Sequence, residues 1–129
     1  MLYHATRQRF IGSIKREGLH AKTKKSFDGQ IGEGLVYFAF DDDVAASYVE
    51  CADNIPESWE DDNIVVLAVR ENSLNRNRFY RDPNIKGEDN STIAYKGSIP
   101  ASKLGIIDFK DRKIIPLLSV QRLSKRFYY

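Results

Sequence analysis

The stretch from Gly34 to Ala52, which reads GLVYFAFDDDVAASYVECA, decides the fold because it joins two different hydrophobic patterns. Leu35–Phe40 is a continuous apolar run of strand length, and such a run predicts a buried strand. Asp41 or Asp42 then provides a helix N-cap, and apolar residues recur on one helix face as far as Ala52. The stretch therefore predicts a buried strand that leads directly into an amphipathic helix.

Patterns of the same two kinds continue on both sides of this stretch. An earlier helix is predicted with Thr6 as its N-cap, Phe10 and Ile14 on its apolar face, and Gly18 just beyond its end. A long polar connection is predicted over residues 72–90. Further strands are predicted at Leu2–Ala5, Ile64–Val69, Thr92–Lys96, Leu104–Phe109 and Ile114–Leu118. Because strands outnumber helices and both helices come early, the sequence predicts the α+β class.

Length and composition are those of one domain that spans residues 1–129. With 42% hydrophobic and 29% charged residues, the chain can bury a core, which excludes the disordered and low-complexity classes. No apolar run approaches the roughly 18 residues of a membrane-spanning helix, and no signal-peptide pattern follows Met1. We therefore expect a cytoplasmic protein with no membrane partner. Cys51 is the single cysteine, so no internal disulfide is expected.

The charged residues are unevenly distributed, although the net charge is only +2. Residues 41–62 contain nine carboxylates and no lysine or arginine, whereas residues 7–25 and 103–129 each contain seven basic side chains. A chain polarised in this way can present a basic surface to a phosphate-bearing ligand. Two solvated faces that only keep the protein in solution are the alternative interpretation, and the charge pattern leaves both open.

Three short motifs follow one another in the order used by the ADP-ribosyltransferase superfamily. Residues 2–6, LYHAT, resemble the Tyr-His-Gly-Thr of the family's first strand. Residues 32–39, GEGLVYFA, and 45–48, AASY, are similar to the Gly-x-Gly-Ile-Tyr-Phe-Ala and Ser-Ala-x-Tyr patterns of poly(ADP-ribose) polymerases. Residues 82–84, DPN, ahead of 90–95, NSTIAY, resemble the small rifamycin ADP-ribosyltransferases. The ordered set implies the family's compact, split antiparallel sheet with two early helices.

The resemblance implies that NAD is a co-substrate whose ADP-ribose is transferred to an acceptor. By this resemblance, His4 would hydrogen-bond the ribose, and the backbone of Ala5, which replaces a glycine, would hold the nicotinamide amide. Tyr37 and Tyr48 would form aromatic walls around the nicotinamide ring. The remaining contacts with NAD are assigned to Thr6, Arg7 and Gly34. The acceptor, a small molecule or a macromolecule, is not specified by the chain, because acceptor loops vary most.

Each of these residues also has a purely structural interpretation. His4 fits a core histidine that a neighbouring carbonyl group satisfies, and the two tyrosines fit ordinary core positions. Arg7, Lys24 and Lys25 are candidates for binding the pyrophosphate, and each of them fits a solvated surface side chain as well. The motifs point to NAD because all of these positions agree together.

The family's catalytic glutamate, which stands at the start of a late strand, has no counterpart in this sequence. Alignment places Ser91 or Thr92 at that position. A carboxylate about 4 Å from a developing cation would contribute roughly 4 kcal/mol at an effective dielectric constant near 20, or about a thousandfold in rate. Asp82, which matches the aspartate of the rifamycin-modifying enzymes, is the predicted replacement, and Glu88 and Asp89 are weaker ones. An aspartate that starts a turn before a proline is the structural alternative.

Two further functions stay open. An RNA 2′-phosphotransferase also uses NAD and begins with a similar strand, although it normally carries a separate N-terminal module. A catalytically silent module of the same fold would bind NAD, nucleic acid or a protein. The basic stretches 110–113 and 121–126, ahead of the aromatic residues 127–129, would then contact a phosphate backbone, unless the aromatic residues pack the tail. With two histidines and one cysteine, no metal site is predicted.

Overall fold

The computed structural model describes residues 1–20, 34–52, 55–83 and 90–129, which contain seven strands and two α-helices. The strands are β1 (Leu2–Arg7), β2 (Leu35–Ala39), β3 (Ile64–Val69), β4 (Phe79–Tyr80), β5 (Thr92–Lys96), β6 (Gly105–Asp108) and β7 (Lys113–Pro116). The helices are α1 (Ile11–Glu17) and α2 (Asp42–Glu50). Two of the 3₁₀ turns, Gln8–Phe10 and Glu57–Trp59, matter for the site described below.

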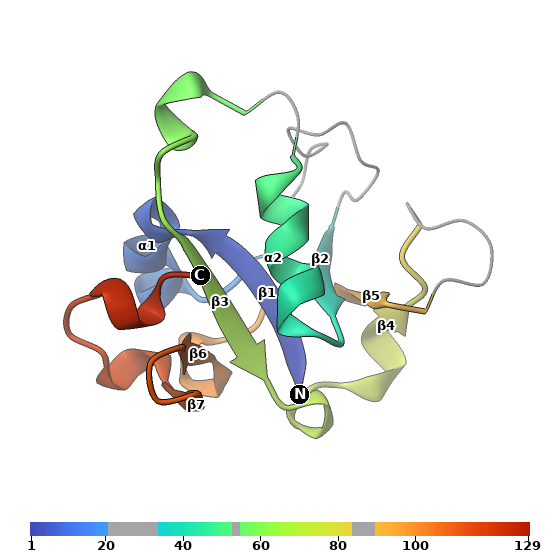
Figure 1. Ribbon diagram of the computed structural model, residues 1–129. Helices are drawn as coiled ribbons and strands as arrows, with labels where there is room; N and C mark the ends of the chain where they lie inside the picture. Colours follow the sequence, from blue (N-terminus) through green and yellow to red (C-terminus); the bar gives the residue numbers. More distant parts are fainter. Residues whose placement is uncertain (21–33, 53–54, 84–89) are drawn as a thin grey trace.

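All seven strands join in one antiparallel sheet with the order β4-β5-β2-β1-β3-β6-β7. The first strand of the chain therefore lies in the middle of the sheet, between β2 and β3. Helix α2 crosses in front of β1 and β2, and α1 lies behind the sheet (Figure 1). A sheet with few helices confirms the predicted α+β class.

The two faces of the sheet carry two apolar cores, because successive strand residues point to opposite sides. On the α1 face, Ile11 and Ile14 pack with strand residues that include Leu2, Val36, Phe38, Leu67 and Ile106. On the α2 face, Ala45 and Ala46 pack with Ala5, Ala39, Val66 and Ile107. Because alanines predominate in the second core, α2 can approach the sheet closely.

The sheet opens between β1 and β2. Strand β1 pairs with β3 along its whole length, and β2 pairs with β5 along its whole length. Between β1 and β2 the register holds one pair only, Tyr3 with Ala39. Beyond that pair the two strands separate toward Arg7 and Leu35. The sheet thus consists of two halves joined at one corner, and this opening positions the site.

The start of the first helix differs from the sequence prediction. Thr6 was expected to cap it, but Thr6 lies inside β1, and α1 begins at Ile11 after a 3₁₀ turn. Pairing with β3 extends the strand, because the N–H of Gln8 still donates to the carbonyl oxygen of Asn63 at 2.8 Å. Gly18 ends α1 with a φ of 82°, as its position predicted. At α2, the Asp41 side chain accepts from the N–H of Asp43, which confirms the predicted cap.

The structure also differs from the sequence prediction at two later strands, because β4 was not predicted and β7 ends earlier than predicted. Strand β4 lies within the predicted polar connection, and it is a two-residue edge strand that pairs with β5. Strand β7 ends at Pro116, after which residues 117–119 form a 3₁₀ turn. A short edge strand in a polar segment carries no apolar alternation from which it could be predicted.

Asp108, at the end of β6, makes the C-terminal region sensitive to acid. Burial acts to raise the pKa of this carboxyl, but the backbone N–H of Asp111, the Arg126 guanidinium and the backbone N–H of Lys110 together hold the pKa below its usual value. A folded-state pKa below the unfolded one stabilises the fold above about pH 4, and this stabilisation is lost as the pH falls through the folded-state pKa.

We expect the thermal midpoint to fall as the pH drops below about 4, and Asp108→Asn to reduce that dependence. Calorimetric melts of both proteins between neutral and acidic pH measure the two slopes. The matched control is Asp111→Asn, because Asp111 is exposed and also pairs with Arg126. Identical pH dependence in the wild-type protein and Asp108→Asn would assign the acid sensitivity to other carboxyls.

Candidate active site

A cavity of about 460 Å³ runs through the opening between β1 and β2. Because the strands separate there, the cavity is lined from both faces of the sheet. Its walls come from β1, β2 and α1, from α2, and from the Glu57–Trp59 turn. Of the predicted site residues, the cavity lining includes His4, Ala5, Thr6, Arg7, Tyr37, Tyr48 and Asp82. The structure thus brings together residues that lie up to 78 positions apart in the chain.

His4 lies on the α1 face of the sheet, where its ring meets the Phe38 ring edge-on at 6.0 Å. Its Nδ1 lies 2.7 Å from the backbone oxygen of Tyr37, across the opening. Because a carbonyl oxygen can only accept, Nδ1 carries the proton in this contact. His4 therefore has the carbonyl partner of the structural interpretation, and it also lines the cavity.

The backbone of Ala5 points into the opening. Hydrogen-bonded pairs alternate along an antiparallel ladder, and Gln8 with Asn63 is such a pair between the extension of β1 and that of β3. Thr6 and His4 therefore bond to β3, whereas the N–H and C=O of Ala5 face β2, from which β1 has separated. The methyl group of Ala5 packs in the alanine-rich core under α2. The backbone groups of Ala5, rather than its methyl group, thus face the opening.

Tyr37 and Tyr48 are half-buried and line the cavity from the α2 side. Tyr37 shares its sheet face with Ala39, and Tyr48 belongs to α2. His4 and Tyr37 therefore lie on opposite faces, and only the opening lets both line one cavity. A third phenol, Tyr3, lies beside them, and burial, followed by the charges of Asp42 and Asp41, raises its pKa. Tyr3 accordingly stays protonated at neutral pH.

Asp82 is buried, with 5% of its surface exposed, and it lines the same cavity as His4 and Tyr48. The hydroxyl of Thr92, at the start of β5, donates to its Oδ2 at 3.1 Å. Thr92 is one of the two positions that the resemblance aligned with the glutamate of ADP-ribosyltransferases, and the structure places Asp82 beside Thr92. Among the described residues, Glu17 is the other carboxylate that lines the cavity, and it is exposed.

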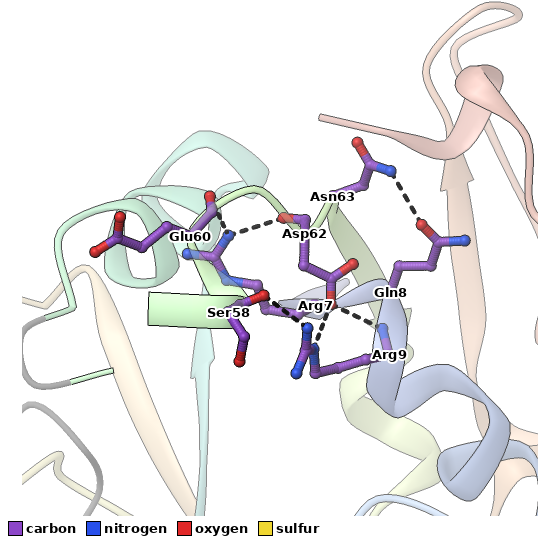
Figure 2. A network of polar contacts seen from close by, with 7 residues as sticks. All are labelled: Arg7, Gln8, Arg9, Ser58, Glu60, Asp62 and Asn63. Atoms are coloured by element: carbon purple, nitrogen blue, oxygen red, sulfur yellow. Dashed lines mark hydrogen bonds and ion pairs between the residues drawn. The ribbon is translucent and has the colours of Figure 1, made fainter. Parts of the chain in front are cut away.

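The sequence suggested that Arg7 binds pyrophosphate or lies in solvent, but its environment in the structure is different. It is buried rather than solvated, with 8% exposure. Its guanidinium donates to the backbone oxygens of Asp62 at 2.8 Å and Glu60 at 3.4 Å (Figure 2). It also donates to the backbone oxygen of Val49 at 3.5 Å. Arg7 therefore ties the loop before β3 to the end of β1. A contact with pyrophosphate would have to compete with these carbonyl groups.

The other predicted contacts are not all placed at the cavity. Gly34, with a φ of 80°, precedes β2 and is not among the residues that line it. Lys24, Lys25, Gly32, Asn84, Glu88 and Asp89 lie outside the described residues. Two residues that the sequence analysis did not assign, Thr92 and Trp59, do line the cavity. Thr92 was indicated by its alignment with the glutamate position, whereas no pattern indicated Trp59.

Two charged regions outside the cavity have structural explanations. The carboxylates of Asp41, Asp42 and Asp43 lie within 4.8 Å of one another at the start of α2, where Asp41 caps the helix. In the C-terminal tail, Phe127 is buried, and the N–H of Tyr129 donates to the carbonyl oxygen of Ile64 at 2.8 Å. The aromatic residues therefore pack this tail, as the structural alternative for it predicted.

Comparison of the chain with protein-family models, with curated proteins and with solved structures gives no match. None of the helices in the described part of the chain combines the length and the apolar character needed to cross a membrane. The site geometry and the sequence motifs therefore carry the functional assignment.

Proposed function

We propose that the protein transfers ADP-ribose from NAD to an acceptor, with His4 and Tyr37 positioning NAD and Asp82 stabilising the transition state. The observation that carries this proposal is the shared cavity, which a buried aspartate, an imidazole and the two phenol rings of Tyr37 and Tyr48 all line. These residue types can hold the nicotinamide ring and the ribose and can stabilise the positive charge that develops on the ribose as nicotinamide leaves.

The nicotinamide half of NAD fits the α2 side of the opening. The backbone N–H and C=O of Ala5 match an amide group, which needs one acceptor and one donor. The rings of Tyr37 and Tyr48 offer aromatic faces to the planar pyridinium. His4, on the other side of the opening, is the candidate partner for a ribose hydroxyl.

The reaction breaks the bond between the ribose C1′ and the nicotinamide nitrogen. The bonding electron pair goes to nicotinamide, which leaves neutral, and positive charge develops on the ribose ring. The carboxylate of Asp82 stabilises this charge electrostatically. A lone pair of the acceptor then forms the new bond to C1′, and the acceptor's proton passes through Asp82 to solvent.

Incubation with labelled NAD and candidate acceptors tests the proposal. We expect release of nicotinamide and, by mass analysis, the addition of ADP-ribose to an acceptor or to water. Asp82→Asn serves as the inactive control. Binding of NAD without release of nicotinamide would instead support a silent module of the same fold, and the absence of any NAD binding would contradict the proposal.

Thr92 provides a milder test of the same chemistry. Thr92→Val keeps the side-chain shape but removes the hydroxyl that orients Asp82. Because a hydrogen bond to a charged group contributes roughly 1.5 kcal/mol or more, we expect kcat to fall about tenfold with little change in KM. Thr92→Ser restores the donor and should restore most of the rate. Equal rates for Thr92→Val and the wild-type enzyme would show that this hydroxyl does not orient the acid.

A further inference from the structure

Trp59 and Phe10 form an aromatic pair at the open end of the cavity. Both residues line it, and their rings meet edge-on with centroids 5.0 Å apart. Phe10 ends the turn that follows β1, whereas the closed end of the opening is the pair of Tyr3 and Ala39. The aromatic pair therefore stands away from the closed end, beyond Ala5.

A polar network fixes Trp59 in this position. The Arg9 backbone N–H and its Nε both donate to Oδ2 of Asp62, at 3.1 and 2.8 Å, and the Arg9 guanidinium also donates to the backbone oxygen of Ser58 at 2.9 Å. Figure 2 shows Arg9 reaching Ser58 and Asp62, and Arg7 reaching Glu60 and Asp62. The loop that carries Trp59 is thus anchored just before and just after this residue.

The Arg9 guanidinium also lies over the Trp59 indole, with its central carbon 5.3 Å from the ring centroid. A cation on an indole and a fixed loop hold the ring in one orientation before any ligand arrives, which lowers the entropy cost of binding. A preorganised tryptophan in the wall of a cavity is a stacking platform for a flat ring.

We propose that Trp59 and Phe10 form a subsite for the adenine ring of NAD, an inference that rests on the proposed function. NAD carries two flat ring systems, and two pairs of aromatic residues in the cavity lining can receive them. The first, Tyr37 with Tyr48, is assigned to nicotinamide. Both pairs line the same cavity, so one extended NAD molecule can contact both of them.

Intrinsic fluorescence tests this subsite directly, because Trp59 is the single tryptophan of the chain. We expect AMP and ADP-ribose to change the emission of the wild-type protein saturably, and nicotinamide mononucleotide to leave it nearly unchanged. By calorimetry, Trp59→Leu should weaken NAD and AMP binding about tenfold, whereas Trp59→Phe should retain most of the affinity. Nicotinamide mononucleotide should bind all three proteins equally, and thermal melts establish that both variants are folded.

The outcomes separate this inference from the proposed function. If AMP and ADP-ribose bind at Trp59 but NAD is not cleaved, the adenine subsite stands and the transferase proposal is wrong. If NAD is cleaved and Trp59→Leu binds it as tightly as the wild-type protein, the subsite is wrong and the transferase proposal stands. A variant that weakens nicotinamide mononucleotide and AMP alike would also overturn the subsite, because Trp59 would then act on the cavity as a whole.

Discussion

Asp82→Asn is expected to slow NAD cleavage by about a thousandfold while leaving NAD affinity nearly unchanged. The amide has the shape of the carboxylate and can still accept the hydroxyl of Thr92, so the buried pair persists. What is lost is the negative charge beside the ribose carbon, which acts on the transition state far more than on bound NAD. Nicotinamide release gives the rate, and calorimetric titration gives the affinity.

Glu17→Gln is the matched control, because Glu17 is the second carboxylate that lines the cavity among the described residues. It lies at the exposed end of α1, and we expect a near wild-type rate. If Glu17→Gln greatly reduced the rate while Asp82→Asn kept the wild-type rate, the catalytic carboxylate would be Glu17, on the other side of the opening. Loss of NAD binding in Asp82→Asn would mean that the aspartate contributes to the binding of NAD itself and not only to the stabilisation of the transition state.

Gly18→Ala is expected to destabilise the fold by about 3 kcal/mol. Gly18 has a φ of 82°, which side chains rarely adopt, and a Cβ there would lie 2.5 Å from the carbonyl oxygen of Ile99. That oxygen accepts from the N–H of Leu19 at 2.8 Å, and both Leu19 and Ile99 are buried. The methyl group would therefore strain the backbone and force apart the bridge that ties the end of α1 to the segment after β5. Chemical denaturation measures the loss.

Gly34→Ala separates the two causes. Gly34 has nearly the same φ, 80°, but a Cβ there would meet nothing within 4 Å. We expect this substitution to lower the free energy of unfolding by about 1 kcal/mol, which is the cost of the backbone conformation alone. Equal losses in the two variants would show that the contact with Ile99 adds nothing.

The elements that could be predicted from the sequence are those with a local cause. The apolar run forms β2 itself, and Asp41 caps the helix that begins at the next residue. Both predictions are confirmed. Gly18 is confirmed as the end of α1 for the same reason. The predicted start of the first helix was wrong because Thr6 belongs to β1, where it pairs with Val65, a residue far away in the chain.

The sequence named residues that the structure brings to one cavity, but it did not predict the shape of that cavity. The motifs named His4, Tyr37 and Asp82, and the structure brings them to one cavity. His4 and Tyr37 lie on opposite faces of the sheet, and both line one cavity only because β1 and β2 separate, which no single segment encodes. The buried state of Arg7 and the place of Trp59 depend likewise on contacts between β1 and a distant loop.

The central place of β1 has a consequence for how the molecule assembles. During synthesis the first strand leaves the ribosome before either of its neighbours exists, so it waits unpaired until β3 has been made. Closing such distant pairings is slow compared with forming helices from local contacts. We therefore expect the unpaired β1 segment to be prone to aggregation until β3 has been made.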